Sequence, residues 1–214
     1  MRTSLLTCLL CGCLLPGCTG FGPPTGEKWR ELIHGDSSAS AVQGLRSPDA
    51  EARRWSVIAL ARQGDPAGAD KLIPMLDKSR EPSALVRATA AAGLRMLGDK
   101  RAVSALLAAC GDSEPIVRGE AARALGALGG PKEVPALARA LREDREANVR
   151  LEAAYALTRI GGENALPALV AALDDLDASV AFAAHRALLE MTHQNLPPIR
   201  APWQTWLEQR PPSN

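Results

Sequence analysis

Four arginines recur along the chain at a nearly constant interval and raise the question of a phosphate-binding surface. They are Arg53, Arg87, Arg118 and Arg150, and the last three follow a valine at spacings of 31 and 32 residues. Arginines repeated along one groove could bind successive phosphates of a nucleic acid. The 25 Lys and Arg against 24 Asp and Glu, however, attract a polyanion only weakly. We therefore expect no nucleic-acid partner.

An acidic residue stands six places before three of these arginines, and the same place is acidic again before Ala181, where the arginine is lost. The four acids are Glu81, Asp112, Asp144 and Asp175. A carboxylate at this place can cap the N-terminus of the helix that follows. Because Asp175 persists although its own copy lacks the arginine, we expect each acid to pair with the arginine of the preceding copy. The eight residues then form a structural ladder.

Glu190 and His193 match the Glu-x-x-His spacing that places two ligands on one helical face in di-iron proteins. A di-iron site needs a second such pair and two further carboxylates, and the sequence offers neither. His185 replaces an alanine found in three other copies, so we expect it to pack under a C-terminal cap. No nucleophilic triad or phosphate-binding glycine loop is evident. We expect no catalytic residue, no metal or other cofactor and no small-molecule substrate.

The N-terminal residues are predicted to be a signal peptide. Arg2 precedes an apolar run of eleven residues, 5–15, which is shorter than the roughly 20 residues that cross a bilayer. Leu15-Pro16-Gly17-Cys18 then resembles the bacterial lipobox. The resemblance implies diacylglyceryl transfer to the Cys18 sulfur, cleavage after Gly17 and a lipid-anchored protein on the periplasmic side of the cell envelope. An ordinary cleaved signal peptide is the alternative.

The mature chain would keep two cysteines, Cys18 and Cys110, which excludes a disulfide framework. Cys110 ends an apolar helical run, and we expect it to be a small buried side chain. Thr19 follows the lipidated position; if the host has two membranes, the absence of Asp there favours sorting to the outer one.

Internal repetition predicts the fold. We count each copy from its repeated arginine, or from Ala181 in the fifth copy, and call this place the motif position. A leucine stands seven residues after it in every copy: Leu60, Leu94, Leu125, Leu157 and Leu188. Three residues after it stands Ser56 in the first copy and alanine in the others. Eleven residues after it stands a glycine in four copies, Gly64, Gly98, Gly129 and Gly161, with Thr192 in the fifth. These spacings indicate an amphipathic helix with a glycine C-cap, and the apolar run after each glycine indicates a second, shorter helix.

The combination resembles the HEAT-repeat family, in the short bacterial form also seen in phycobilin lyase subunits, over about residues 45–192. The resemblance implies an all-α, right-handed α-solenoid of about five helical hairpins with terminal caps, whose second helices line a concave binding surface. We divide the chain into a signal peptide (1–17), a lipidated Cys and flexible tether (18–26), an N-terminal cap with Trp29, Leu32 and Ile33 (27–45), the repeats (46–192), and a C-terminal cap and tail (193–214).

The predicted function is that of a lipid-anchored scaffold binding another protein, of unknown identity, or an envelope component through its concave face. The contacts would be exposed members of the second helices: Asp70, Lys71, Arg101, Lys132, Arg139 and Glu163. An enzyme-like role is the alternative, either as a lyase or chaperone for a cofactor-bearing protein or as a metal-dependent oxygenase. Deoxyhypusine hydroxylase, an enzyme on the same repeats, uses His-Glu dipeptides, but no histidine of this chain precedes a glutamate. A purely structural spacer is a third possibility.

Overall fold

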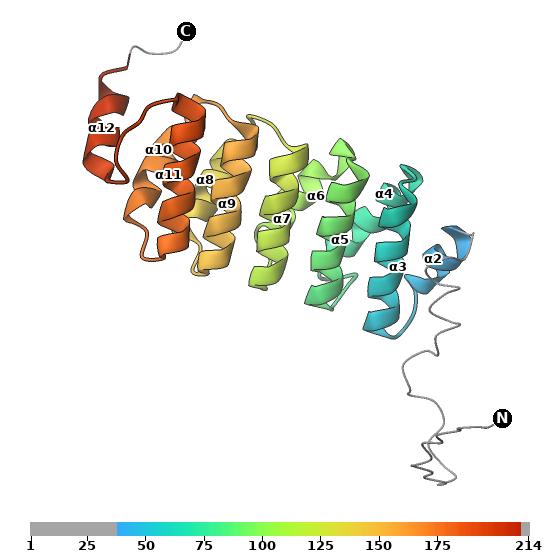
Figure 1. The fold of residues 1–214 in the computed structure, drawn as a ribbon. Helices are drawn as coiled ribbons and strands as arrows, with labels where there is room; N and C mark the ends of the chain where they lie inside the picture. The colour runs from blue at the N-terminus through green and yellow to red at the C-terminus, as the bar shows by residue number, and fades with distance from the viewer. Residues whose placement is uncertain (1–37, 211–214) are drawn as a thin grey trace, which may run out of the picture.

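The computed structural model describes residues 38–210, and every regular element in them is helical. Long first helices alternate with shorter second segments. The first helices are α3 (Ala50–Gln63), α5 (Ala84–Leu97), α7 (Pro115–Leu128), α9 (Ala147–Ile160) and α11 (Ala178–Thr192). The second segments are α4 (Ala67–Leu72) with the 3-10 helix η1 (Ile73–Leu76), η2 (Lys100–Ala102) with α6 (Val103–Ala109), α8 (Val134–Glu143), and η3 (Glu163–Ala165) with α10 (Leu166–Ala171) and η4 (Ala172–Asp174). Figure 1 shows the first helices side by side in one layer, which confirms the predicted α-solenoid.

The core lies between the two layers and is built from the repeated positions. The five leucines at the seventh position are at most 3% exposed, and the small residues at the third position are fully buried. Both sets lie on one face of each first helix, because three and seven residues are close to one and two helical turns. The predicted core face is therefore confirmed.

Small side chains also set how closely neighbouring helices approach. A Cβ atom added to Gly126 of α7 would lie 2.7 Å from the Cα of Ala156 of α9 and 2.9 Å from its Cβ. A separation under 3.0 Å is not tolerated between real atoms, so a larger residue at either position would push the helices apart. The chain has few aromatic side chains, seven in 214 residues, and small residues at the helix contacts allow the helices to pack closely.

All four glycines are the C-cap residues of their helices, as predicted, but their backbone conformations differ. Gly64 and Gly98 have φ angles of 68° and 73° and are left-handed, and Gly161 combines a positive φ of 73° with an extended ψ of −164°. Gly129 is extended, with a φ of −77°. A glycine is still needed, because a Cβ at this residue would lie 2.7 Å from the carbonyl oxygen of Leu125.

The starts of the first helices differ from the expectation for the ladder acids. Pro115 is the first residue of α7, whereas Pro82 precedes the N-cap residue Ser83 of α5. The ladder acids do not bind first-turn N–H groups. Asp112, for example, accepts from the N–H of Glu114, the N-cap residue itself, at 2.9 Å. The reason is that the guanidinium of the preceding copy holds the carboxylate outside the helix end.

The two ends of the solenoid are covered by additional helices. At the N-terminal end α2 (Ser38–Gly44) packs on α3, whereas the predicted cap residues before it lie outside the described part of the chain. At the C-terminal end α12 (Arg200–Glu208) packs on α10 and replaces the second segment of the last copy. Trp203 of α12 is fully buried, and its Nε1–H donates to the carbonyl oxygen of Pro197 at 2.9 Å.

Candidate functional site

The arginine ladder runs along the edge where each second segment connects to the next first helix. Arg87 illustrates the geometry. Its Nε and Nη2 each donate to one carboxylate oxygen of Asp112 at 2.8 Å, and its Nη1 donates to the carbonyl oxygens of Glu81 and Pro82 at 2.9 Å. The two side chains are only 1% and 5% exposed. One guanidinium thus joins its own copy to the next.

The same arrangement recurs in the other three copies that carry the arginine. Nε–carboxylate distances are 2.6 Å for Arg53–Glu81, 2.7 Å for Arg118–Asp144 and 2.8 Å for Arg150–Asp175. In each copy Nη1 donates to the carbonyl oxygens of two consecutive residues of the loop that precedes the arginine's own helix. The ladder therefore links all consecutive repeats through bidentate ion pairs, the strongest common geometry for these groups.

The surroundings of the ladder carboxylates keep them ionised. Burial raises the pKa of Asp112, but the hydrogen bonds donated by Arg87 and by the N–H of Glu114 outweigh it and hold the pKa below its usual range. The pKa of Asp144 is lowered by the same balance. For Asp175 the hydrogen bonds from Arg150 are the largest influence, and they also lower its pKa.

This geometry leaves little capacity for a phosphate ligand. A guanidinium has five N–H donors, and each ladder arginine uses four of them in bonds to the protein. A phosphate could bind only by displacing a carboxylate that is better placed. The ladder is therefore best described as a connection between repeats.

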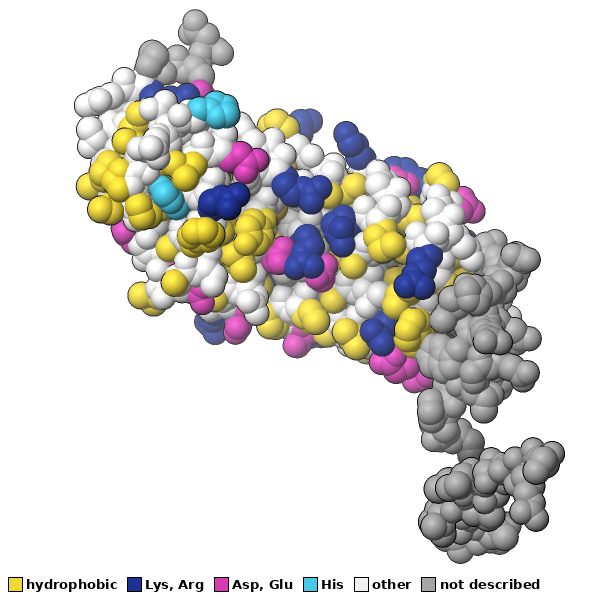
Figure 2. Space-filling view, viewed as in Figure 1, with side chains coloured by type: hydrophobic (Ala, Val, Ile, Leu, Met, Phe, Trp, Pro, Cys, Tyr) yellow, Lys and Arg dark blue, Asp and Glu magenta, His cyan; other side chains and the backbone are white. Residues whose placement is uncertain are grey.

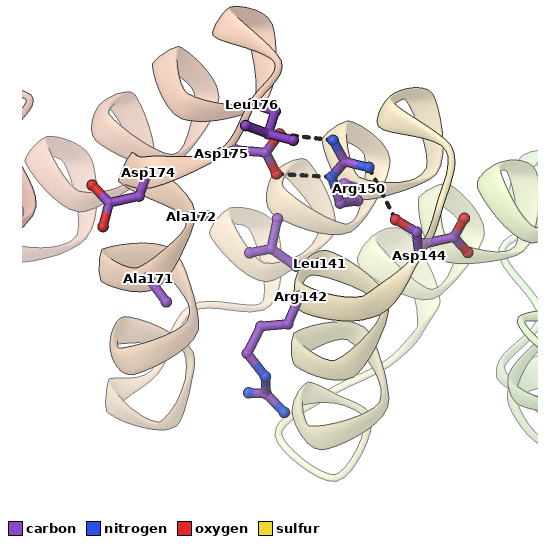
Figure 3. A pocket seen from close by; sticks show the side chains of 9 residues that line it. All are labelled: Leu141, Arg142, Asp144, Arg150, Ala171, Ala172, Asp174, Asp175 and Leu176. Atoms are coloured by element: carbon purple, nitrogen blue, oxygen red, sulfur yellow. Dashed lines mark hydrogen bonds and ion pairs between the residues drawn. The ribbon is translucent and has the colours of Figure 1, made fainter.

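Beside the ladder, the loops of successive copies leave open notches on the surface. The notch in Figure 3 has a volume of about 460 Å³ and lies next to the Arg150–Asp175 pair. Figure 3 shows Arg142 extending away from this pair, while Leu176 is fully exposed at the rim. The three carboxylates at the notch are all held in ion pairs, Asp175 by Arg150, Asp144 by Arg118 and Asp174 by Arg200, so the notch offers no free carboxylate for catalysis.

The histidines and Cys110 also occupy structural positions. The His185 ring nitrogen Nε2 is 2.8 Å from the carbonyl oxygen of Leu196, and its ring packs edge-on against Trp203, so it lies under the C-terminal cap. His193, one residue after Thr192, is the C-cap of α11 in a left-handed conformation with a φ of 56°. Within residues 38–210 no three His, Cys, Asp or Glu side chains are grouped to hold a metal ion. Burial raises the pKa of the Cys110 thiol to about 12, so it is no nucleophile at neutral pH.

The six predicted binding residues are all exposed and lie in the second segments or in the loops that begin them. Asp70 and Arg101 form an ion pair at 2.8 Å, and Glu163 pairs with Arg210. Arg101 and Glu163 lie in the 3-10 helices that begin their second segments, Lys132 lies in the loop before α8, and Arg139 lies in the middle of α8. Lys71, Lys132 and Arg139 have no hydrogen-bond or ion-pair partner among the described residues.

A second surface, which the sequence reasoning missed, lies on the first helices. All five large hydrophobic side chains that are exposed on helices belong to this layer within residues 38–210: Leu85, Met96, Ile116, Tyr155 and Phe182. Figure 2 views the molecule from the same side as Figure 1 and shows hydrophobic side chains exposed on this face beside Lys and Arg side chains. Only Met96 stands at a copy position that is charged or small in every other copy, so alignment of the repeats offers little signal for this surface.

These features define an α-solenoid whose repeats are joined by buried arginine–carboxylate pairs. The model for HEAT repeats matches residues 79–158, and the model for the PBS lyase HEAT-like repeat matches 52–78 and 149–175, so that together they cover residues 52–175, more than half of the chain. The chain belongs to the HEAT-repeat family. No curated protein sequence matches it.

Solved structures agree with this fold. The complex of CpcE and CpcF of phycocyanin lyase from Nostoc sp. PCC7120 is 23% identical, with a TM-score of 0.64 over 86% of this chain and 71% of that one. A designed armadillo repeat protein is 19% identical, with a TM-score of 0.56 over 81% of this chain and 87% of that one. A second designed armadillo repeat protein, in complex with a (KR)4 peptide, is 20% identical, with a TM-score of 0.56 over 79% and 86%. At these identities the likeness establishes the fold alone.

Proposed function

We propose that this protein is a lipid-anchored HEAT-repeat scaffold that binds another protein through the surface of its first helices. The observation that carries the proposal is the distribution of exposed apolar side chains. Met96 is 58% exposed, Tyr155 49% and Phe182 62%, and each lies on a different first helix. Large exposed apolar groups on a folded protein commonly mark an interaction surface.

The basic residues of the same layer support this assignment. Every basic side chain within the five first helices is an arginine, whereas the lysines of residues 38–210 lie in the second segments and loops. Protein interfaces are enriched in arginine, methionine and aromatic residues and depleted in lysine. The second-segment surface is less suited, because Asp70 and Arg101 already neutralise each other.

Anchoring through Cys18 is the second part of the proposal, and it rests on the lipobox-like sequence 15–18, which lies outside the described residues. No helix within residues 38–210 has the length and apolar character needed to span a bilayer. Two or more acyl chains on Cys18 would hold the protein stably at a membrane surface.

A photo-crosslinking scan in intact cells tests the binding surface. The full chain would carry p-benzoylphenylalanine at Met96, Ile116 or Phe182 on the first helices, with exposed Ser104 and Ala108 of α6 as matched control positions. We expect an adduct of one constant mass from at least two first-helix positions and none from α6. Adducts from α6 alone, or from no position, would refute the proposed surface.

The anchor is tested separately by mass spectrometry of the N-terminal peptide. We expect the mature chain to begin at Cys18 with acyl chains on its sulfur and amino group, and a Cys18→Ser variant to leave the membrane fraction. A mature N-terminus without lipid would contradict the anchor without affecting the binding surface.

A further inference from the structure

Two helices of the first layer carry the same pair of residue types one turn apart. On α9 Tyr155 is followed four residues later by Arg159, and on α11 Phe182 is followed four residues later by Arg186. Residues at this spacing lie on the same face of a helix. Because α9 and α11 pack side by side, the four side chains lie on neighbouring helices of one surface, which we term the aromatic–arginine patch.

The arginines of this patch are unpaired. Arg159 and Arg186 are exposed and have no hydrogen-bond or ion-pair partner among residues 38–210. On the neighbouring α7, by contrast, Arg123 is paired with both Glu120 and Glu152. Glu152, which lies on α9 itself, is thus bound by Arg123, and the two guanidiniums of the patch remain available to a partner.

One acidic residue lies close enough to require comment. Glu190 follows Arg186 by one turn of α11 and is exposed, but it is not within ion-pair distance of Arg186 or Arg159. Counted with Glu190, the two arginines of the patch leave one net positive charge. The ladder carboxylates do not offset the positive charge of the patch, because they are buried in ion pairs along a loop edge.

We propose that the aromatic–arginine patch is the docking site for an acidic protein segment, one that places an apolar side chain between carboxylates. The aromatic rings offer apolar area at low entropic cost, and such residues dominate the binding energy of protein interfaces. The two planar guanidiniums match carboxylates in bidentate geometry. This inference rests on the proposed function, because it assumes that the first helices bind a protein.

An anionic membrane is a poorer match for the same patch. Recognition of anionic lipids typically uses clusters of about four to eight basic residues. The patch holds two, and both are arginines flanking aromatic rings that are 49% and 62% exposed. A partner that combines apolar and acidic groups therefore fits better than a charged surface alone.

The test uses p-benzoylphenylalanine at Phe182 in the full chain in intact cells, followed by sequencing of the crosslinked peptide. One variant adds Arg159→Glu and Arg186→Glu. Its matched control adds Arg139→Glu and Arg142→Glu, which change two exposed arginines of α8 that have no ion-pair partner among residues 38–210. We expect the adduct yield to fall at least about 10-fold in the first variant and less than about 2-fold in the control, because glutamates in the patch would face the acidic partner with like charges.

The crosslinked peptide should carry at least two carboxylates next to the attachment point. Far-ultraviolet circular dichroism checks that both variants fold, and an Arg159→Gln plus Arg186→Gln variant repeats the test without introducing acids. An undiminished yield in either patch variant, an attached peptide without acidic residues, an attached lipid, or attachment to a second copy of this chain would overturn the inference. The first two outcomes leave the proposed function standing, whereas the absence of any first-helix adduct would remove both.

Discussion

The Arg87–Asp112 pair gives the sharpest test of how the repeats are held together. The change Asp112→Asn keeps the shape of the side chain but removes its charge and one of two acceptors for the guanidinium. Arg87 is only 1% exposed, so water cannot replace the lost partner. Removing one member of a buried ion pair costs about 3–5 kcal/mol, and we expect about 3 kcal/mol here because the amide oxygen still accepts one hydrogen bond.

Urea unfolding followed by circular dichroism measures this cost. The matched control is Asp174→Asn, which removes one member of the exposed Arg200–Asp174 pair and should cost less than about 1 kcal/mol. Because each ladder pair joins adjacent repeats, Asp112→Asn should also lower the urea dependence of the free energy of unfolding, as the two halves of the solenoid separate. Equal and small costs for both variants would refute the view that the ladder connects the repeats.

Three further predictions concern packing, pH and the buried thiol. Gly126→Ala should destabilise the protein by about 1–3 kcal/mol, because the new Cβ would lie 2.7 Å from the Cα of Ala156. The control Gly119→Ala should be neutral or stabilising, because the nearest atom to its new Cβ is 3.9 Å away. Reversed signs in urea unfolding would contradict the packing argument. The pKa values of the ladder carboxylates are lowered in the folded state, so the stability they contribute is present above the unfolded pKa of about 4 and is lost as the pH falls through the folded values. Urea titrations should show this loss of stability only below about pH 4. A loss already between about pH 7 and 5 would be inconsistent with the lowered pKa values. Burial raises the pKa of the Cys110 thiol to about 12. At pH 8 Cys110 should therefore react with a thiol reagent at least about 100-fold more slowly in the folded than in the unfolded chain. Rapid labelling of the folded protein would show that the thiol is accessible and would contradict this prediction.

The repeated pattern explains why much of the fold could be predicted. Leu94 and its counterparts recur at a position that is buried in every copy, and a repeated environment imposes a repeated residue type. The acids are equally informative. Asp175 persists where its own copy has Ala181, and in the structure it pairs with Arg150 of the preceding copy.

The departures from the predictions arise where contacts between copies override the local pattern. Gly129 resembles the other C-caps in sequence, but the chain leaves α7 there in an extended conformation. The N–H of Gly130, the residue after Gly129, donates to the carboxylate of Glu133 at 2.7 Å. The ladder acids look like helix caps, but the guanidinium of the preceding copy draws them away from the first turn. A one-dimensional spacing does not contain these competing partners.

The candidate binding surface was the least accessible to sequence reasoning. Tyr155 and Phe182 stand at different positions of their copies, so alignment of the repeats does not bring them together. Only the packing of α9 on α11 places them on neighbouring helices of one layer. The six predicted residues were chosen by their place in the second segments, and the ion pairs of Asp70 and Glu163 became visible only in three dimensions.

The sequence by itself determined the helical repeat, its buried face and the charge pattern of the ladder, because each of these depends on contacts that recur at a fixed separation along the chain. The tertiary structure alone decided which arginines remain free and which apolar side chains meet on the surface. Those properties depend on the distance and rotation between neighbouring helices, which the close approach of Gly126 and Ala156 helps to set.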